Sequence, residues 1–194
     1  MKVLVVSEGK HEQSGALENL LVKLGAVRET LEFDRVSNRT IHAFHGKGRG
    51  YFKRALCWLK EAKEREANAL ILLIDEDGRS ERITEIRDAQ DYHDSQLARA
   101  MGVAIRTFDA WMLADETALS KVLGNTVDRQ PNPETIRDPK ETCAGLLKDR
   151  DKQISQSQMY AEVSGKIDID VLCDRCQRGF KPFAARVKSV FQRA

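Results

Sequence analysis

Two short, uninterrupted apolar runs constrain the fold of this chain more than any other feature. KVLVV (2–6) and ALILLI (69–74) are rich in branched aliphatic residues, which is typical of strands that are covered on both faces. Such strands occur in parallel sheets, where helices cross over between neighbouring strands. Two further stretches, RTIHAF (39–44) and VAIRTF (103–108), are also predicted to be strands.

The segments between these strands show helical periodicity. A leucine repeat ends at Gly25, which predicts a helix stop, and a second apolar face lies within 51–66. The polar stretch 79–101 predicts a helix toward Leu97, and DAWMLAD (109–115) predicts the start of another. The sequence therefore predicts an α/β fold, Rossmann-like, with about four parallel strands flanked by helices.

The pattern changes after residue 116. Three of the four prolines lie within 125–139, which predicts a loop. No strand is predicted beyond it. We therefore expect a core, residues 1–116, and a helical extension, residues 117–194, that packs on the core. The helices predicted in the extension cover 141–150, 155–164, 168–174 and 180–192.

Composition limits the classes of function. Apolar residues make up 41% of the 194 residues and charged residues 32%, which favours a real core over a disordered chain. A net charge of +2 carries no global signature of nucleic-acid binding, so any such role must come from local patches. Cys173 and Cys176 form one C-x-x-C without the second ligand pair of a zinc site. The apolar N-terminal run is too short for a secretory or membrane segment, and we expect a cytoplasmic protein with reduced thiols.

Carboxylates gather where the predicted strands end. Glu8 lies two residues beyond the first strand, Asp75 and Asp77 follow the third, and Asp109 follows the fourth. Because the carboxyl ends of parallel strands meet at one edge of a sheet, we expect these side chains to converge. Left alone, they would raise each other's pKa and destabilise the fold. Mg²⁺ or Mn²⁺, which prefer oxygen ligands, would relieve the repulsion and activate a water at a phosphoryl group.

Other interpretations of these acidic residues stay open. Acidic residues after strands also serve as turn formers and helix N-caps, although Glu8 and Asp109 at equivalent strand ends favour a metal site. A haloacid-dehalogenase-like phosphatase would place its D-x-D after the first strand, and a receiver domain needs an acidic pair there. GKGRG (46–50) lacks the G-K-[ST] of a phosphate-binding P-loop.

A family resemblance rests on the same motifs. SEGKHE (7–12) after the first strand and DED (75–77) after the third resemble the TOPRIM domain of topoisomerases, primases and OLD-type nucleases. Its signature is a glutamate after the first strand and a D-x-D after the third. TFDAWMLAD (107–115), GKGRG (46–50) and CDRCQRGFKPF (173–183) resemble small bacterial TOPRIM proteins of unknown function, encoded beside AAA-type ATPases in anti-phage loci. The resemblance covers most of the chain.

The resemblance implies a metal-dependent nuclease that hydrolyses phosphodiester bonds. Glu8 would be the metal-linked acid or base, and Asp75 and Asp77 would be catalytic metal ligands for Mg²⁺ or Mn²⁺. Glu12, one helical turn after Glu8, would join a second metal. The resemblance implies a glutamate in the subgroup where Asp109 stands. The shorter side chain of Asp109 keeps the charge but holds it farther from a metal.

The resemblance also implies partners. An AAA- or ABC-type ATPase would control the nuclease as an anti-phage effector, and the alternative is a non-catalytic TOPRIM module that regulates such an ATPase. The last predicted helix has an apolar face whose spacing favours packing on the protein's own core over a partner surface. A homo-oligomer is a further alternative. That apolar face consists of Phe180, Phe183, Val187, Val190 and Phe191.

A basic glycine loop, HGKGRG (45–50), predicts contact with nucleic acid. Glycines permit close approach of the backbone to a phosphate, and cations bind phosphates without sequence preference. A solvated surface loop is an equal alternative. DNA, RNA and tRNA are not distinguished as substrates. The candidates for substrate binding are Lys10, His45, Lys47, Arg49 and Lys53.

Overall fold

The computed structural model describes residues 1–9, 12–37, 50–93, 96–148 and 154–192. Its centre is a four-stranded sheet in the order β2-β1-β3-β4, with every neighbouring pair parallel. The fold class predicted from the sequence is therefore confirmed. The strands are β1 (Val3–Ser7), β2 (Leu31–Arg35), β3 (Ala69–Asp75) and β4 (Ala98–Ala104).

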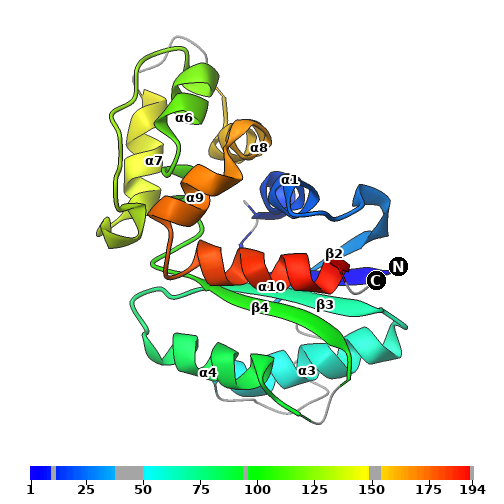
Figure 1. Ribbon diagram of the computed structural model, residues 1–194. Coiled ribbons are helices and arrows are strands. Elements are labelled where there is room, and N and C mark those ends of the chain that lie inside the picture. Colours follow the sequence, from blue (N-terminus) through cyan, green and yellow to red (C-terminus); the bar gives the residue numbers. More distant parts are fainter. Residues whose placement is uncertain (10–11, 38–49, 94–95, 149–153, 193–194) are drawn as a thin grey trace.

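Helices cover both faces of the sheet (Figure 1). The helices α1 (Ala16–Lys23) and α10 (Phe180–Gln192) lie on one face, and α3 (Tyr51–Glu64) and α4 (Glu81–Gln90) lie on the other. Side chains along each strand alternate between two buried clusters, so that Val3 and Val5 face one helical layer while Leu4 and Val6 face the other. This double burial explains why β1 and β3 read as continuous apolar runs.

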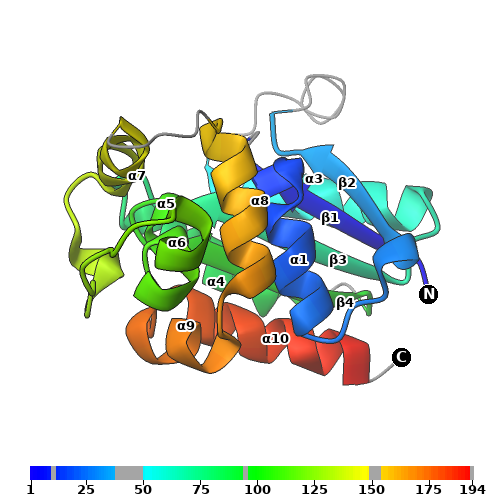
Figure 2. The same cartoon turned by 90° about the horizontal axis from the view of Figure 1, so that it is seen from above.

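Short helices form a second group beside the sheet (Figure 2). Among them, α8 packs along α1, where the Asn19 side chain donates to the carbonyl of Ala161 at 2.9 Å. This group includes α5 (Asp109–Met112), α6 (Glu116–Leu123), α7 (Pro139–Lys148), α8 (Gln156–Lys166) and α9 (Ile169–Arg175). The 3-10 turns of the described chain are η1 (Glu12–Ser14), η2 (Arg28–Thr30) and η3 (Pro133–Thr135).

Two sequence predictions for the fourth strand and the helix before it are wrong. The strand spans 98–104 instead of 103–108, and the helix ends at Gln90 instead of continuing toward Leu97. The side chain of Gln90 accepts a hydrogen bond from Met101 N at 2.7 Å, and Arg99 Nε donates to the carbonyl of Gln90 at 2.9 Å. The end of α4 thus pairs with the outer edge of β4. The strand predicted at 39–44 lies outside the described residues, and β2 was not predicted.

The last helix packs on the protein's own core. Phe180, Phe183 and Val187 of α10 are fully buried, and α10 makes its main contacts with β4. Gly102 makes this approach possible, because a Cβ there would lie 2.5 Å from the ring of Phe183. One continuous apolar cluster contains residues of the sheet, α1, α8 and α10. The spacing argument for core packing is thereby confirmed.

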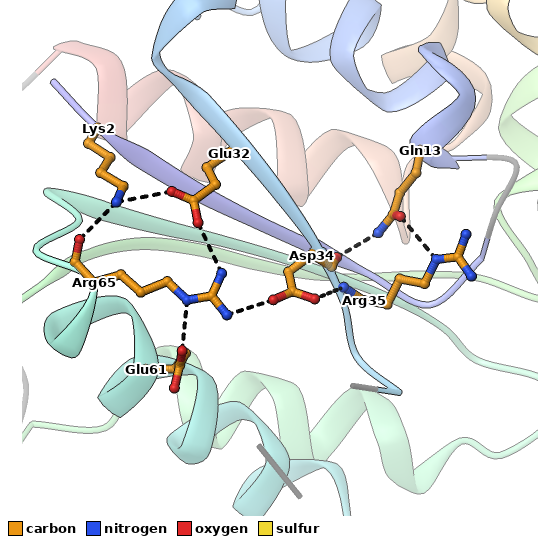
Figure 3. A network of polar contacts seen from close by, with 7 residues as sticks. All are labelled: Lys2, Gln13, Glu32, Asp34, Arg35, Glu61 and Arg65. Atoms are coloured by element: carbon orange, nitrogen blue, oxygen red, sulfur yellow. Dashed lines mark hydrogen bonds and ion pairs between the residues drawn. The ribbon is translucent and has the colours of Figure 1, made fainter. Parts of the chain in front are cut away.

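The outer strand β2 is held by ion pairs (Figure 3). Arg65, at the end of α3, lies 3.0 Å from a carboxylate oxygen of Glu32, 2.7 Å from Asp34 and 2.7 Å from Glu61. Glu32 and Asp34 belong to β2 and Glu61 to α3, so one guanidinium ties the strand to the helix. Charged side chains on this edge also discourage pairing with another strand.

Candidate carboxylate site

Glu8 joins the ends of two strands. It follows β1 directly, and its Oε2 accepts a hydrogen bond from the backbone N–H of Asp75 at 2.9 Å, at the end of β3. Its Oε1 accepts a hydrogen bond from the phenol of Tyr51, the first residue of α3. Burial, and then this hydrogen bond, raise the pKa of Tyr51 to about 12, so the phenol keeps its proton. The predicted convergence of Glu8 and Asp75 is confirmed.

Asp75 connects β3 to the segment after β4. Its Oδ1 accepts a hydrogen bond from the backbone N–H of Phe108 at 2.8 Å, which fixes the entry to α5. Burial, and then the nearby charges of Glu12 and Glu8, hold the pKa of Asp75 well above its usual value. These carboxylates are therefore close enough to repel one another, as the strand-end argument predicts.

Glu12 is the most deeply buried carboxylate of the site. It is 4% exposed, and burial, reinforced by the charges of Asp109 and Glu8, raises its pKa from 4.5 to about 7. Its Oε2 is buried and has no hydrogen-bond partner among the described residues. The side chain lies against the backbone of Gly9, where an added Cβ would come within 2.2 Å of Oε2. Only glycine fits there without displacing Glu12.

The turn η1, which carries Glu12, is fastened to β2. The side chain of Gln13 donates to the carbonyl of Asp34 at 2.6 Å and accepts a hydrogen bond from Arg35 Nε at 3.2 Å (Figure 3). The network around β2 therefore holds in place the turn that carries Glu12.

Asp77 lies at the rim of the site and pairs with an arginine that sequence reasoning missed. Arg82 Nη1 lies 3.0 Å from Asp77 Oδ2 and 3.6 Å from Glu8 Oε2, and it donates to the carbonyl of Asp75 at 2.6 Å. Arg82 is buried, and its guanidinium lies 4.4 Å from the centre of the Tyr51 ring. One feature of the sequence could have indicated a special role for Arg82. Arg82 is in the first turn of α4, where the helix dipole disfavours a cation.

Asp109 is held by the C-terminal helices. Its Oδ1 accepts hydrogen bonds from the phenol of Tyr160 and, at 3.2 Å, from Gln156 Nε2, both on α8. It nevertheless remains near enough to Glu12 to raise the pKa of that residue. The structure thus brings Asp109 to the site, with its carboxylate already satisfied by α8.

The donor set suits Mg²⁺ or Mn²⁺, but it is not arranged as a ready-made cage. Within the described ranges, no three His, Cys, Asp or Glu side chains are placed so as to hold a metal ion. The chemistry fits because the groups are hard carboxylate oxygens, one of which, Glu12 Oε2, is buried without a partner. Holding a metal would require Glu8 and Asp77 to exchange part of their contact with Arg82 for the ion.

Comparison with models of protein families identifies the family of this chain. A family model matches residues 8–188, from the site glutamate to the last turns of α10. The chain belongs to the family described as Domain of unknown function (DUF4276). Comparisons with curated proteins and with solved structures give no match. The family description does not test the resemblance to TOPRIM proteins, which stays a prediction.

The remaining predictions for the DUF4276 chain concern cations and thiols. Lys10, His45, Lys47 and Arg49 lie outside the described residues, and Lys53 is exposed on α3. All four cysteines are free. Burial raises the pKa of the thiols in the C-x-x-C pair, at positions 173 and 176, which opposes a role as reactive thiolates. Among the described residues, no helix combines the length and apolar character that crossing a bilayer requires.

Proposed function

We propose that the protein is a Mg²⁺- or Mn²⁺-dependent nuclease that hydrolyses phosphodiester bonds in nucleic acid. One observation carries the proposal: Glu8, Glu12 and Asp75 meet at the carboxyl edge of the sheet, and Glu12 is buried there with an unpartnered oxygen and a pKa of about 7. A protein that maintains such repulsion without an ion has a destabilised site. The resemblance of the strand-end motifs to TOPRIM nucleases supports the same chemistry.

The position of each residue in the site suits it to a different role in the proposed reaction. Glu12, Asp75 and Asp77 would hold the metal, and Glu8, fixed between Asp75 N and the Tyr51 phenol, is the group that would accept a proton from the attacking water. When bound, Mg²⁺ or Mn²⁺ would polarise the phosphoryl group and lower the pKa of that water. The buried cation of Arg82 would stabilise the negative charge that develops on the phosphate.

A second candidate function has its own supporting observation. Arg82 already pairs with Glu8 and Asp77, and the described carboxylates are not arranged to hold a metal. Both features suit a non-catalytic module that binds nucleic acid or a partner. In either case the resemblance supports an ATPase partner and a role in anti-phage defence. Co-expression with the product of the neighbouring gene, followed by size-exclusion chromatography, tests for that partner.

The nuclease proposal is tested by incubating the purified chain with plasmid, single-stranded DNA and tRNA in Mg²⁺ or Mn²⁺. We expect cleavage that EDTA blocks and that Asp77→Asn abolishes. Asp88→Asn is the matched control, because Asp88 is an exposed carboxylate on α4 away from the site. If the wild-type chain binds nucleic acid but does not cleave it in any metal condition, even with the partner present, the result would favour the non-catalytic module.

A further inference from the structure

A depression of about 300 Å³ opens beside the carboxylate site. Its walls come from the turn after β3, the connection between β4 and α5, and the start of α7. Asp77 belongs to both places, since it lines the depression and pairs with Arg82 of the site. A ligand in the depression would therefore lie directly next to the proposed reaction centre.

Two arginines make this depression a candidate site for an anion. Arg106 and Arg137 line it together with two carboxylates: Asp77, which pairs with Arg82, and Asp138, whose Oδ1 accepts a hydrogen bond from Glu141 N at 2.9 Å. Within the described part of the chain, neither of the two guanidinium groups is engaged in an ion pair. Arginine presents a planar fork of donors that matches the oxygens of a phosphate. Thr107 lines the same walls, and its hydroxyl oxygen is buried without a hydrogen-bond partner in the described chain.

The backbone holds Arg106 in a costly conformation. Arg106 has φ 62°, in the left-handed region, which is unfavourable for a residue other than glycine. Two hydrogen bonds stabilise it: Arg106 N donates to Glu76 Oε2 at 3.0 Å, and its carbonyl accepts from Asp77 N at 2.9 Å. Glu76, the middle residue of the acidic stretch, thus positions an arginine and leaves Asp75 and Asp77 to the site.

We infer that this depression binds a backbone phosphate of a nucleic acid, next to the phosphate that is cleaved. The unpaired guanidinium groups of Arg106 and Arg137 supply positive charge, and the hydroxyl of Thr107 supplies a further hydrogen bond. Because Asp77 belongs to both places, the bound phosphate would lie next to the carboxylate site. The inference rests on the proposed function for the identity of its ligand. It adds a substrate contact next to Asp77 that uses none of the residues of the basic stretch 45–50.

The test measures binding without catalysis. Fluorescence anisotropy with labelled single- and double-stranded oligonucleotides is recorded in EDTA at several salt concentrations. We expect Arg137→Ala to weaken binding about tenfold at low salt and to reduce the slope of log K against log [salt] by about one. The double variant with Arg106→Ala should weaken binding further without a second unit of slope, because both arginines contact the same phosphate. Arg87→Ala is the matched control, because the Arg87 side chain is exposed on α4, and it should leave the slope unchanged.

Two further measurements keep the outcomes separate. Arg106→Lys and Arg137→Lys preserve charge and should restore most of the salt slope, and thermal melts of each variant identify any loss of folding. Unchanged affinity and slope in folded Arg137→Ala and Arg106→Ala would overturn the inference, as would a wild-type chain that binds no nucleic acid. If the wild type cleaves nucleic acid and the arginine variants bind it with unchanged affinity and salt slope, the phosphate site is rejected and the nuclease proposal stands. Binding that depends on both arginines, without cleavage under any metal condition, rejects the nuclease and keeps the phosphate site.

Discussion

Replacing Glu12 with glutamine should stabilise the metal-free protein at alkaline pH. The side chain is 4% exposed and its pKa is about 7, against an ordinary value of 4.5. At ~1.4 kcal/mol for each unit of pKa shift, this difference sets an upper limit of about 3 kcal/mol on what the charged carboxylate costs the folded state. The neutral amide has nearly the same size, so packing against Gly9 is retained.

The net gain is smaller than this limit, because a buried amide leaves polar groups unpaired. That penalty is about 1–3 kcal/mol, so we expect Glu12→Gln to raise the free energy of unfolding by up to about 2 kcal/mol at pH 8. For a chain of this size the melting temperature should rise by up to about 8 °C.

The sign of the pH dependence follows from the proton count. Between the unfolded pKa of 4.5 and the folded pKa of about 7, the folded state keeps a proton on Glu12 that the unfolded state releases. The contribution of Glu12 to wild-type stability is therefore fully present below the unfolded pKa and is lost as the pH rises through the folded pKa. The advantage of Glu12→Gln should be greatest at pH 8 and should shrink toward pH 5.

The assay is chemical denaturation and thermal melting of both proteins in EDTA at several pH values, repeated with Mg²⁺ or Mn²⁺. Metal should stabilise the wild type, because an ion that binds only the folded state adds RT ln(1 + [L]/Kd). Glu12→Gln should lose much of that increment. A variant that is less stable than the wild type at pH 8 in EDTA would show that Glu12 is a structural residue, and the reasoning about repulsion would fail.

Three further variants test other contacts of the structure. Asp77→Asn should change the metal-free free energy of unfolding by less than about 1 kcal/mol, because its side chain is 52% exposed and its pair with Arg82 lies at the rim; urea titration measures this, and a large loss would make Asp77 structural. Glu134→Ala should cost about 2–4 kcal/mol, since this buried carboxylate accepts two backbone N–H bonds at the start of α10; an unchanged denaturation midpoint would contradict that role. Tyr160→Phe should cost about 1–3 kcal/mol, because the phenol is buried against Asp109; equal stability of the two proteins would argue against the bond.

The sequence predicts those strands whose burial is uniform. β1 and β3 are covered on both faces, so apolar residues run through them without a break. β4 contains Arg99 and Gly102, each for a tertiary reason: Arg99 binds the end of α4, and Gly102 admits the ring of Phe183. Neither contact is visible in local periodicity, and the strand was placed five residues late. In the edge strand β2, Leu31 and Phe33 pack on the core and alternate with charges that pair with Arg65 at the end of α3, so the strand has no continuous apolar run.

The same distinction applies to the carboxylate site. Parallel strands deliver their carboxyl ends to one edge, so the meeting of Glu8 with Asp75 follows from counting strands. Tyr51 and Arg82 come from the first turns of two helices, and their direction toward Glu8 depends on how those helices pack. Asp109 depends on α8, which is 47 or more residues away in sequence. Sequence reasoning therefore found the acids of the site and missed most of the groups that hold them.

These holding groups decide where a cation would matter. In the stretch from Asp75 to Asp77, each side chain has a separate partner: Asp75 accepts from Phe108 N, Glu76 from Arg106 N, and Asp77 pairs with Arg82. Backbone donors and one arginine thus relieve much of the repulsion between neighbours in sequence. What they leave is Glu12 and Asp75, whose pKa values are raised first by burial and then by the charges of neighbouring carboxylates. A divalent ion would therefore stabilise the fold most by neutralising these two carboxylates.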